Sequence, residues 1–168
     1  MHQRHHILAA TLMLFGTACQ GRQDTGQPTV DDICANETRV DEQLLDDPRV
    51  TPDGAFIVTL IQAEPDPPEK ATNTWGFSIT TIQGDPIPDA SLQLTPVMPD
   101  HGHGTSPKHF AAVYDDASDL YLVDGFSLSM AGFWEVTATV ANNTEPGSEQ
   151  ADTAFESAEI VFALCVSG

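Results

Sequence analysis

The segment TPVMPDHGHGTSPKHF, residues 95–110, gathers side chains that can bind a metal ion. Its candidate ligands are Met98, Asp100, His101, His103 and His109. Imidazole nitrogen suits copper and zinc, whereas thioether sulfur is soft and favours Cu(I). In an extended chain, residues two apart point to the same side with their Cα atoms about 6–7 Å apart. His101 and His103 can therefore reach one ion, and the residue types make this loop a candidate metal site in which thioether sulfur would favour Cu(I).

The neighbouring residues allow two interpretations. Gly102 and Gly104 let the backbone bend toward an ion without steric cost. Asp100 can supply an oxygen to Cu(II) or fix a histidine tautomer, and His109 is either a third imidazole or a surface residue. In the alternative, the glycines satisfy a tight loop, Met98 fills the end of the domain and the histidines face solvent. The segment has no zinc-finger or HExxH spacing, so the residues alone leave both interpretations open.

The N-terminus predicts export. Residues 1–18 have the polar start and short apolar run of a signal peptide, and the run is too short for an ordinary membrane span. The following GTAC resembles the lipobox of bacterial lipoproteins and predicts lipidation of Cys19. The alternative is an ordinary signal peptide cut nearby. We expect a lipid-anchored protein on the periplasmic face of the cell envelope, and Gln20 after the cysteine hints at the outer membrane.

The two cysteines that remain, Cys34 and Cys165, are an even pair in a compartment that permits disulfides. We favour a disulfide between them over two buried free thiols. Such a bridge would close a loop of about 130 residues and would remove both thiolates as metal ligands.

Charge and composition divide the chain. With 25 acidic residues against six Lys and Arg, its formal net charge is −19, which makes nucleic acid a poor partner. Residues 19–53 are polar and acidic without a sustained period, so they predict a tether, partly held by Cys34. Residues 54–168 supply one domain with a core of its own.

The domain has the pattern of an all-β fold. The strand containing Trp75, Phe77 and Ile79 alternates apolar and polar residues, as half-buried strands do. Seven short strands are predicted, at residues 55–62, 72–82, 91–97, 110–116, 120–130, 132–140 and 154–166. Without convincing helices between them, they predict an immunoglobulin-like antiparallel β-sandwich.

Three segments carry a resemblance to a known family. NTWGFSIT, GDPIPDASLQLTPVMPDHGHG and GFSLSMAGFWEV are similar to the YtkA-like (FixH/YtkA-related) domain, a small β-sandwich of bacterial envelope proteins. The resemblance covers about Phe56 to Val140. By position it implies Met98, His101, His103 and Met130 as metal ligands. Ala131 stands where many relatives have proline.

The resemblance also implies a function. Members of this family are often encoded with, or fused to, copper-handling proteins, which implies copper binding or delivery and a copper-handling envelope partner. We expect no enzymatic activity, because GFSLS lacks the second glycine of a nucleophile elbow and HGHGTS lacks the lysine of a phosphate loop. The alternative function is a metal-free structural or protein-interaction domain of the envelope.

Overall fold

The computed structural model describes residues 30–142 and 157–167, so the segment predicted to be a signal peptide and the predicted lipidation site Cys19 lie outside the described residues. Its elements in chain order are α1 (Val30–Ala35), β1 (Arg49–Val50), β2 (Ile57–Glu64), β3 (Thr72–Thr80), β4 (Ala90–Met98), the 3-10 helix η1 (Pro99–His101), β5 (His103–Gly104), β6 (Phe110–Ala111), β7 (Val113–Asp115), β8 (Leu120–Ser127), β9 (Gly132–Asn142) and β10 (Ala158–Val166). Within these described ranges, neither helix is long and apolar enough to cross a membrane.

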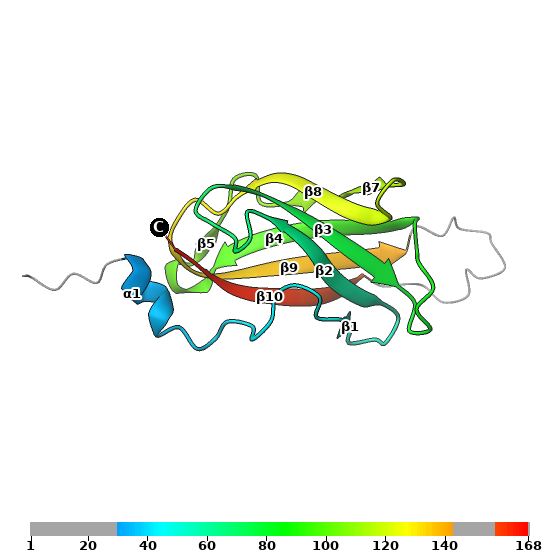
Figure 1. Ribbon diagram of the computed structural model, residues 1–168, viewed down its shortest axis with the longest axis horizontal. Helices are drawn as coiled ribbons and strands as arrows, with labels where there is room; N and C mark the ends of the chain where they lie inside the picture. Colours follow the sequence, from blue (N-terminus) through cyan, green and yellow to red (C-terminus); the bar gives the residue numbers. More distant parts are fainter. Residues whose placement is uncertain (1–29, 143–156, 168) are drawn as a thin grey trace, which may run out of the picture.

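The strands form two antiparallel sheets that pack face to face (Figure 1). One sheet has the order β1-β2-β3-β8-β7. The other has the order β10-β9-β4-β5, with β6 also paired to β4. The β-sandwich predicted from the sequence is confirmed.

The core lies between the two sheets. It is formed by the residues that point inward at every second position of each strand. Trp75, Phe77 and Phe162 meet edge to face at its centre, with ring centroids 5.5–6.2 Å apart, as aromatic quadrupoles favour. The alternation predicted for β3 holds, since Trp75, Phe77 and Ile79 are buried. The same alternation is seen on β4, β9 and β10, whose buried residues include Leu92, Leu94, Trp134, Val136, Ala138, Val140, Ile160, Phe162 and Leu164.

The predicted strand at residues 110–116 is two short strands on different sheets. β6 pairs with β4, whereas β7 pairs with β8. Ala112 lies between them and donates its N–H to the Leu92 carbonyl at 2.8 Å. The chain therefore crosses from one sheet to the other at this residue, a change of partner that alternation along a single strand does not reveal.

The N-terminal segment differs from a free tether over the part that the structure describes. The disulfide predicted between Cys34 and Cys165 is present, and residues 36–50 then run alongside β10 to β1 (Figure 1). Asp41 donates its N–H to the Ala163 carbonyl at 2.9 Å and accepts the Ala163 N–H at 2.8 Å. Arg49 donates to the Val161 carbonyl at 2.6 Å. This segment, which we call the N-terminal arm (residues 34–50), thus satisfies polar backbone groups on the free edge of β10.

Candidate metal site

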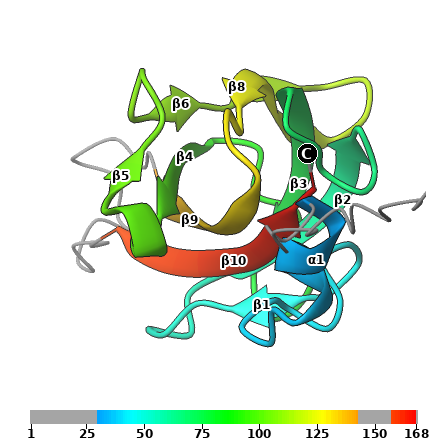
Figure 2. The same ribbon diagram turned by 90° about the vertical axis from the view of Figure 1, so that its left-hand side faces the viewer.

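The candidate loop, residues 98–104, lies at the end of the sandwich where β4 finishes. η1 follows β4 directly, and β5 then turns back to pair with β4, placing His103 opposite Met98 and Gly104 opposite Val97. Figure 2 looks onto this end, where β4 and β5 share one side of the barrel-like outline and α1 lies beside the end of β10. The loop is thus a tight return against its own strand.

Two glycines make this return possible. Gly102 has a φ of 66° and donates its N–H to the Met98 carbonyl at 3.0 Å, which closes η1. Gly104 has an ordinary φ, but a Cβ at this position would lie 2.4 Å from the Pro96 carbonyl oxygen. The glycines therefore serve the backbone, as the metal-free interpretation of the loop requires, and they also bring both histidines next to β4.

The two histidine rings of the loop lie edge to face and are exposed to solvent. Their ring centroids are 5.6 Å apart and their planes are inclined by 75°, and both residues are exposed. Because metal–nitrogen bonds are about 2 Å long, two imidazoles on one ion have centroids within about 6.5 Å of each other. The observed separation of His101 and His103 fits a shared ion.

Met98 lies on the inner side of this pair. Its side chain is 1% exposed, and a Cβ added at Gly132 would lie 3.1 Å from its Cε. Directly opposed residues in an antiparallel ladder share a face, with Cβ atoms about 4.5–5.5 Å apart, so Met98 and His103 are neighbours. The Met98 side chain fills the end of the sandwich, and its residue is paired with His103 in the β4–β5 ladder.

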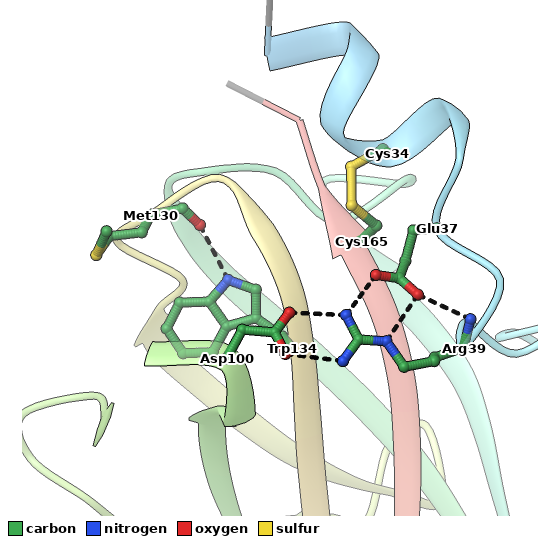
Figure 3. The surroundings of a disulfide bond; sticks show 7 residues. All are labelled: Cys34, Glu37, Arg39, Asp100, Met130, Trp134 and Cys165. Atoms are coloured by element: carbon green, nitrogen blue, oxygen red, sulfur yellow. Dashed lines mark hydrogen bonds and ion pairs between the residues drawn. A yellow bond between two sulfur atoms is a disulfide. The ribbon is translucent and has the colours of Figure 1, made fainter. Parts of the chain in front are cut away.

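Met130 approaches the same end from the chain before β9. Its side chain is 36% exposed, and its carbonyl accepts the indole N–H of Trp134 at 2.9 Å (Figure 3). Met130 lies two residues before Gly132, against which Met98 packs. The structure thus brings both methionine-bearing segments to the start of β9.

His109 lies elsewhere. Its Nδ1 is 2.9 Å from Thr95 Oγ1, at a position of β4 that faces away from the buried Leu94 and Met98. Next to it is a hollow of about 400 Å³ between β4, β5 and the following loop. The hollow is lined by Thr95, Pro96, Val97, Gly102, His103, Gly104, Thr105 and Lys108. The structure therefore does not bring His109 to Met98.

Asp100 is engaged by an arginine that the sequence did not single out. Arg39 Nη1 and Nη2 donate to its two carboxylate oxygens at 2.9 and 2.7 Å. These hydrogen bonds hold the pKa of Asp100 below its ordinary value. Arg39 also donates to Glu37 at 2.6 and 2.8 Å, which lowers the pKa of Glu37 to about 2. One signal was available in the sequence: among so few cations in so acidic a chain, each arginine is expected to have a carboxylate partner.

The donor set suits a soft metal better than a hard one. Within residues 30–142 and 157–167, no group of three or more His, Cys, Asp or Glu side chains is placed to hold an ion. The candidate site consists instead of two imidazoles, the thioether of Met98, whose residue is paired with His103, and the nearby segment of Met130. Thioether and imidazole ligands match copper, and Cu(I) most closely.

Comparisons with known proteins agree with this architecture. The family model described as YtkA-like matches residues 57–139. A copper-bound variant of FetP from uropathogenic Escherichia coli is similar in structure, with 14% identity, 73% of this chain and 95% of that chain covered, and a TM-score of 0.50. As-isolated FetP from the same organism gives 15% identity, 73% and 93% coverage, and a TM-score of 0.47. At 14% identity, the similarity to the copper-bound FetP variant is a similarity of fold. No curated protein sequence matches significantly.

Proposed function

This chain carries a YtkA-like domain at residues 57–139, and on that premise we propose that it is a cell-envelope protein that binds copper. His101 and His103 would supply two nitrogens, and Met98 and Met130 would supply sulfur. Bound there, the metal would be held as a cargo or a one-electron centre; we assign the domain a binding role and no catalytic reaction.

One observation carries the proposal: two exposed imidazoles have ring centroids 5.6 Å apart, in the loop that follows Met98, and the β4–β5 ladder pairs the residue Met98 with His103. The FetP variant of the same fold is copper-bound, which supports copper as the metal.

The location and partner follow from the N-terminal sequence and the family. The signal peptide and lipobox support attachment through a lipid on Cys19, on the periplasmic face of the envelope, with Gln20 favouring the outer membrane. We propose a copper-handling envelope protein as the partner that donates or accepts the ion. An exposed Met130 and exposed histidines suit such exchange, because an incoming ligand can approach from solvent.

Titration of Cu(I) into the mature chain tests the binding role. In competition with a chromophoric Cu(I) chelator, the wild-type chain should bind one ion more tightly than about 1 μM. The double variant His101→Ala/His103→Ala should weaken binding at least about 100-fold. Loss of a residue that only hydrogen-bonds to a metal ligand costs up to about 100-fold in affinity, and loss of two ligands should cost no less. Met98→Leu and Met130→Leu remove sulfur at nearly constant volume and should each weaken Cu(I) more than Cu(II).

His109→Ala is the matched control, because it removes an imidazole a few residues away that the structure turns elsewhere. It should leave the affinity within about threefold of wild type. Binding weaker than micromolar, or full binding by the double histidine variant, would end the copper proposal.

The metal-free alternative rests on a specific observation of its own. Gly102, Gly104 and the buried Met98 all have structural tasks that need no ion. A domain that does not bind Cu(I) but retains a protein partner in its metal-free form would favour this function instead.

A further inference from the structure

Arg39 joins the N-terminal arm to the candidate loop across 61 residues of sequence. It meets Asp100 in a two-bond fork, with Nη1 on one carboxylate oxygen and Nη2 on the other (Figure 3). Asp100 is the middle residue of η1, which follows the buried Met98 and ends at the exposed His101. Arg39 therefore binds the candidate loop at the middle residue of η1.

Arg39 is itself fixed from two further sides. Glu37 accepts hydrogen bonds from Nε at 2.8 Å and from Nη2 at 2.6 Å, and the guanidinium carbon lies 4.0 Å from the centroid of the Phe133 ring. A planar guanidinium holds two carboxylates in fixed directions, whereas the point charge of a lysine ammonium does not. The orientation of Arg39 is thus set before it meets Asp100.

The disulfide anchors this arrangement covalently. Cys34, five residues before Arg39, is bonded to Cys165, and Cys165 is the ladder partner of Phe133 between β10 and β9. The Glu37 N–H also donates to the Cys34 carbonyl at 3.1 Å. Because the arm is tied at Cys34, placing Arg39 over Phe133 requires little further ordering of the chain.

The two-bond contact between Arg39 and Asp100 orients η1 more than it adds to the free energy of folding. The Arg39 and Asp100 side chains are 47% and 54% exposed, and exposed ion pairs add little to the free energy of folding. Among the described residues, Asp100 provides the side-chain hydrogen bonds from η1 to the N-terminal arm, and Met98 as the N-cap adds no capping hydrogen bond. Without the Arg39 fork, η1 would keep its backbone hydrogen bonds, its packing against β9 and the ring contact between His101 and His103, but it would lose its tie to the N-terminal arm.

We propose that Arg39 is a positioning residue for the metal site: through Asp100 it holds η1 so that His101 and His103 face each other across the position of the ion. This inference rests on the proposed copper function. It also gives Asp100 a different role from the ligand considered from the sequence, because both of its oxygens are engaged by Arg39.

The test compares two arginines of the same arm. Arg39→Gln removes the fork, and Arg39→Lys keeps the charge without the two-bond geometry. Arg49→Gln is the matched control, because Arg49 also pairs with an aspartate, at 2.8 Å, and lies over a phenylalanine, at 4.2 Å, but bonds to β10. Cu(I) affinity is measured on the disulfide-bonded mature chain by chelator competition with ascorbate as reductant, alongside the thermal midpoint of the metal-free protein.

Arg39→Gln and Arg39→Lys should each weaken Cu(I) binding about tenfold or more, as loss of an outer partner of a metal ligand does, with a small change in thermal midpoint. Arg49→Gln, at a side chain that is 14% exposed, should show the reverse: a lower thermal midpoint and a Cu(I) affinity within about threefold of wild type.

Asp100→Asn should weaken Cu(I) binding as much as Arg39→Gln does, and the double variant should be no worse than either single variant. Amide exchange at Asp100 to Gly104 should also quicken in metal-free Arg39→Gln.

The outcomes separate this inference from the function on which it rests. If the wild-type chain fails to bind Cu(I), the proposed function fails and the positioning role fails with it. If the wild type binds and Arg39→Gln binds within threefold, only the positioning role is overturned. Unchanged amide exchange in Arg39→Gln would overturn it as well.

Discussion

At the scale of single residues, the two glycines of the candidate loop have different physical tasks. Gly102 adopts a left-handed conformation with open space around the missing side chain, whereas Gly104 has the Pro96 carbonyl oxygen 2.4 Å from the place a Cβ would take. The first requirement concerns backbone energy, and the second concerns contact with another strand. A substitution at each position should therefore fail in a different way.

Gly104→Ala should displace β5 from β4, because carbonyl oxygen on a rigid strand cannot move aside. We expect a loss of about 1–3 kcal/mol in the free energy of unfolding and, with His103 displaced from Met98, weaker Cu(I) binding. Thermal unfolding and chelator competition measure the two effects. Gly102→Asn is the matched control, since asparagine tolerates the left-handed region, and it should cost less in both measurements. Equal effects of the two variants would contradict this assignment.

The sequence could identify the residues of the site but not their surroundings. His101, His103, Met98 and Met130 were predicted together, and the structure gathers their segments at one end of the sandwich. The burial of Met98 was not readable, because the last inward residue of a strand and a sulfur ligand have the same local pattern. The role of Arg39 was missed because its contact with Asp100 spans 61 residues and leaves no local spacing. Glu37 contacts Arg39 and not Asp100, so its part in the arrangement was missed together with that of Arg39.

At the scale of elements, the N-terminal arm covers the outer edge of β10. Asp41 occupies both polar groups of Ala163, and Arg49 caps the Val161 carbonyl. A strand edge with free N–H and C=O groups invites pairing with another chain. The arm therefore protects this sheet from edge-to-edge association, and the disulfide keeps the arm in place.

Replacing Cys34 and Cys165 by serine should lower the free energy of unfolding by about 3–5 kcal/mol, because the bridge closes a loop across 131 residues. The Ala163 amide should then exchange faster with solvent, since the arm detaches more often. Chemical denaturation and amide exchange report on the two effects. Asp41→Ala keeps the disulfide but removes one edge contact, so it should speed exchange at Ala163 with a much smaller loss of stability. Unchanged stability in the serine variant would count against the anchoring role.

Strand prediction succeeded where burial imposes a period and failed where it does not. β2, β3, β4, β8, β9 and β10 are long enough for alternation to show which residues face the core. The two-residue strands β1 and β5 carry no period, and the division between β6 and β7 depends on a change of partner strand. The arm was read as a tether because its polar residues are held by edge hydrogen bonds and one bridge, not by an apolar face.

At the scale of the whole molecule, acidity acts on stability in two opposite ways. The formal net charge is −19, so the carboxylates repel one another in the compact folded state. This repulsion weakens as falling pH protonates them. Other carboxylates are stabilised by the fold: hydrogen bonds from Arg39 lower the pKa of Glu37 from 4.5 to about 2. Hydroxyl and backbone donors lower the pKa of Asp53 and of Asp115 below the ordinary 3.8.

These two effects predict a stability maximum at mildly acidic pH. Above about pH 4.5 the Glu37 contribution is fully present, and it is lost as the pH falls through about 2, because the folded state then binds fewer protons than the unfolded state. Between neutrality and about pH 5 the fading repulsion instead raises stability. The thermal midpoint of the metal-free protein, measured by circular dichroism at low salt, should therefore rise and then fall on acidification. Glu37→Gln should make the acid limb shallower without changing the neutral limb, since Asp53 and Asp115 still contribute to it, and added salt should flatten the neutral limb by screening the repulsion. A midpoint that falls steadily from neutral pH would show that local carboxylate contacts outweigh the net charge throughout.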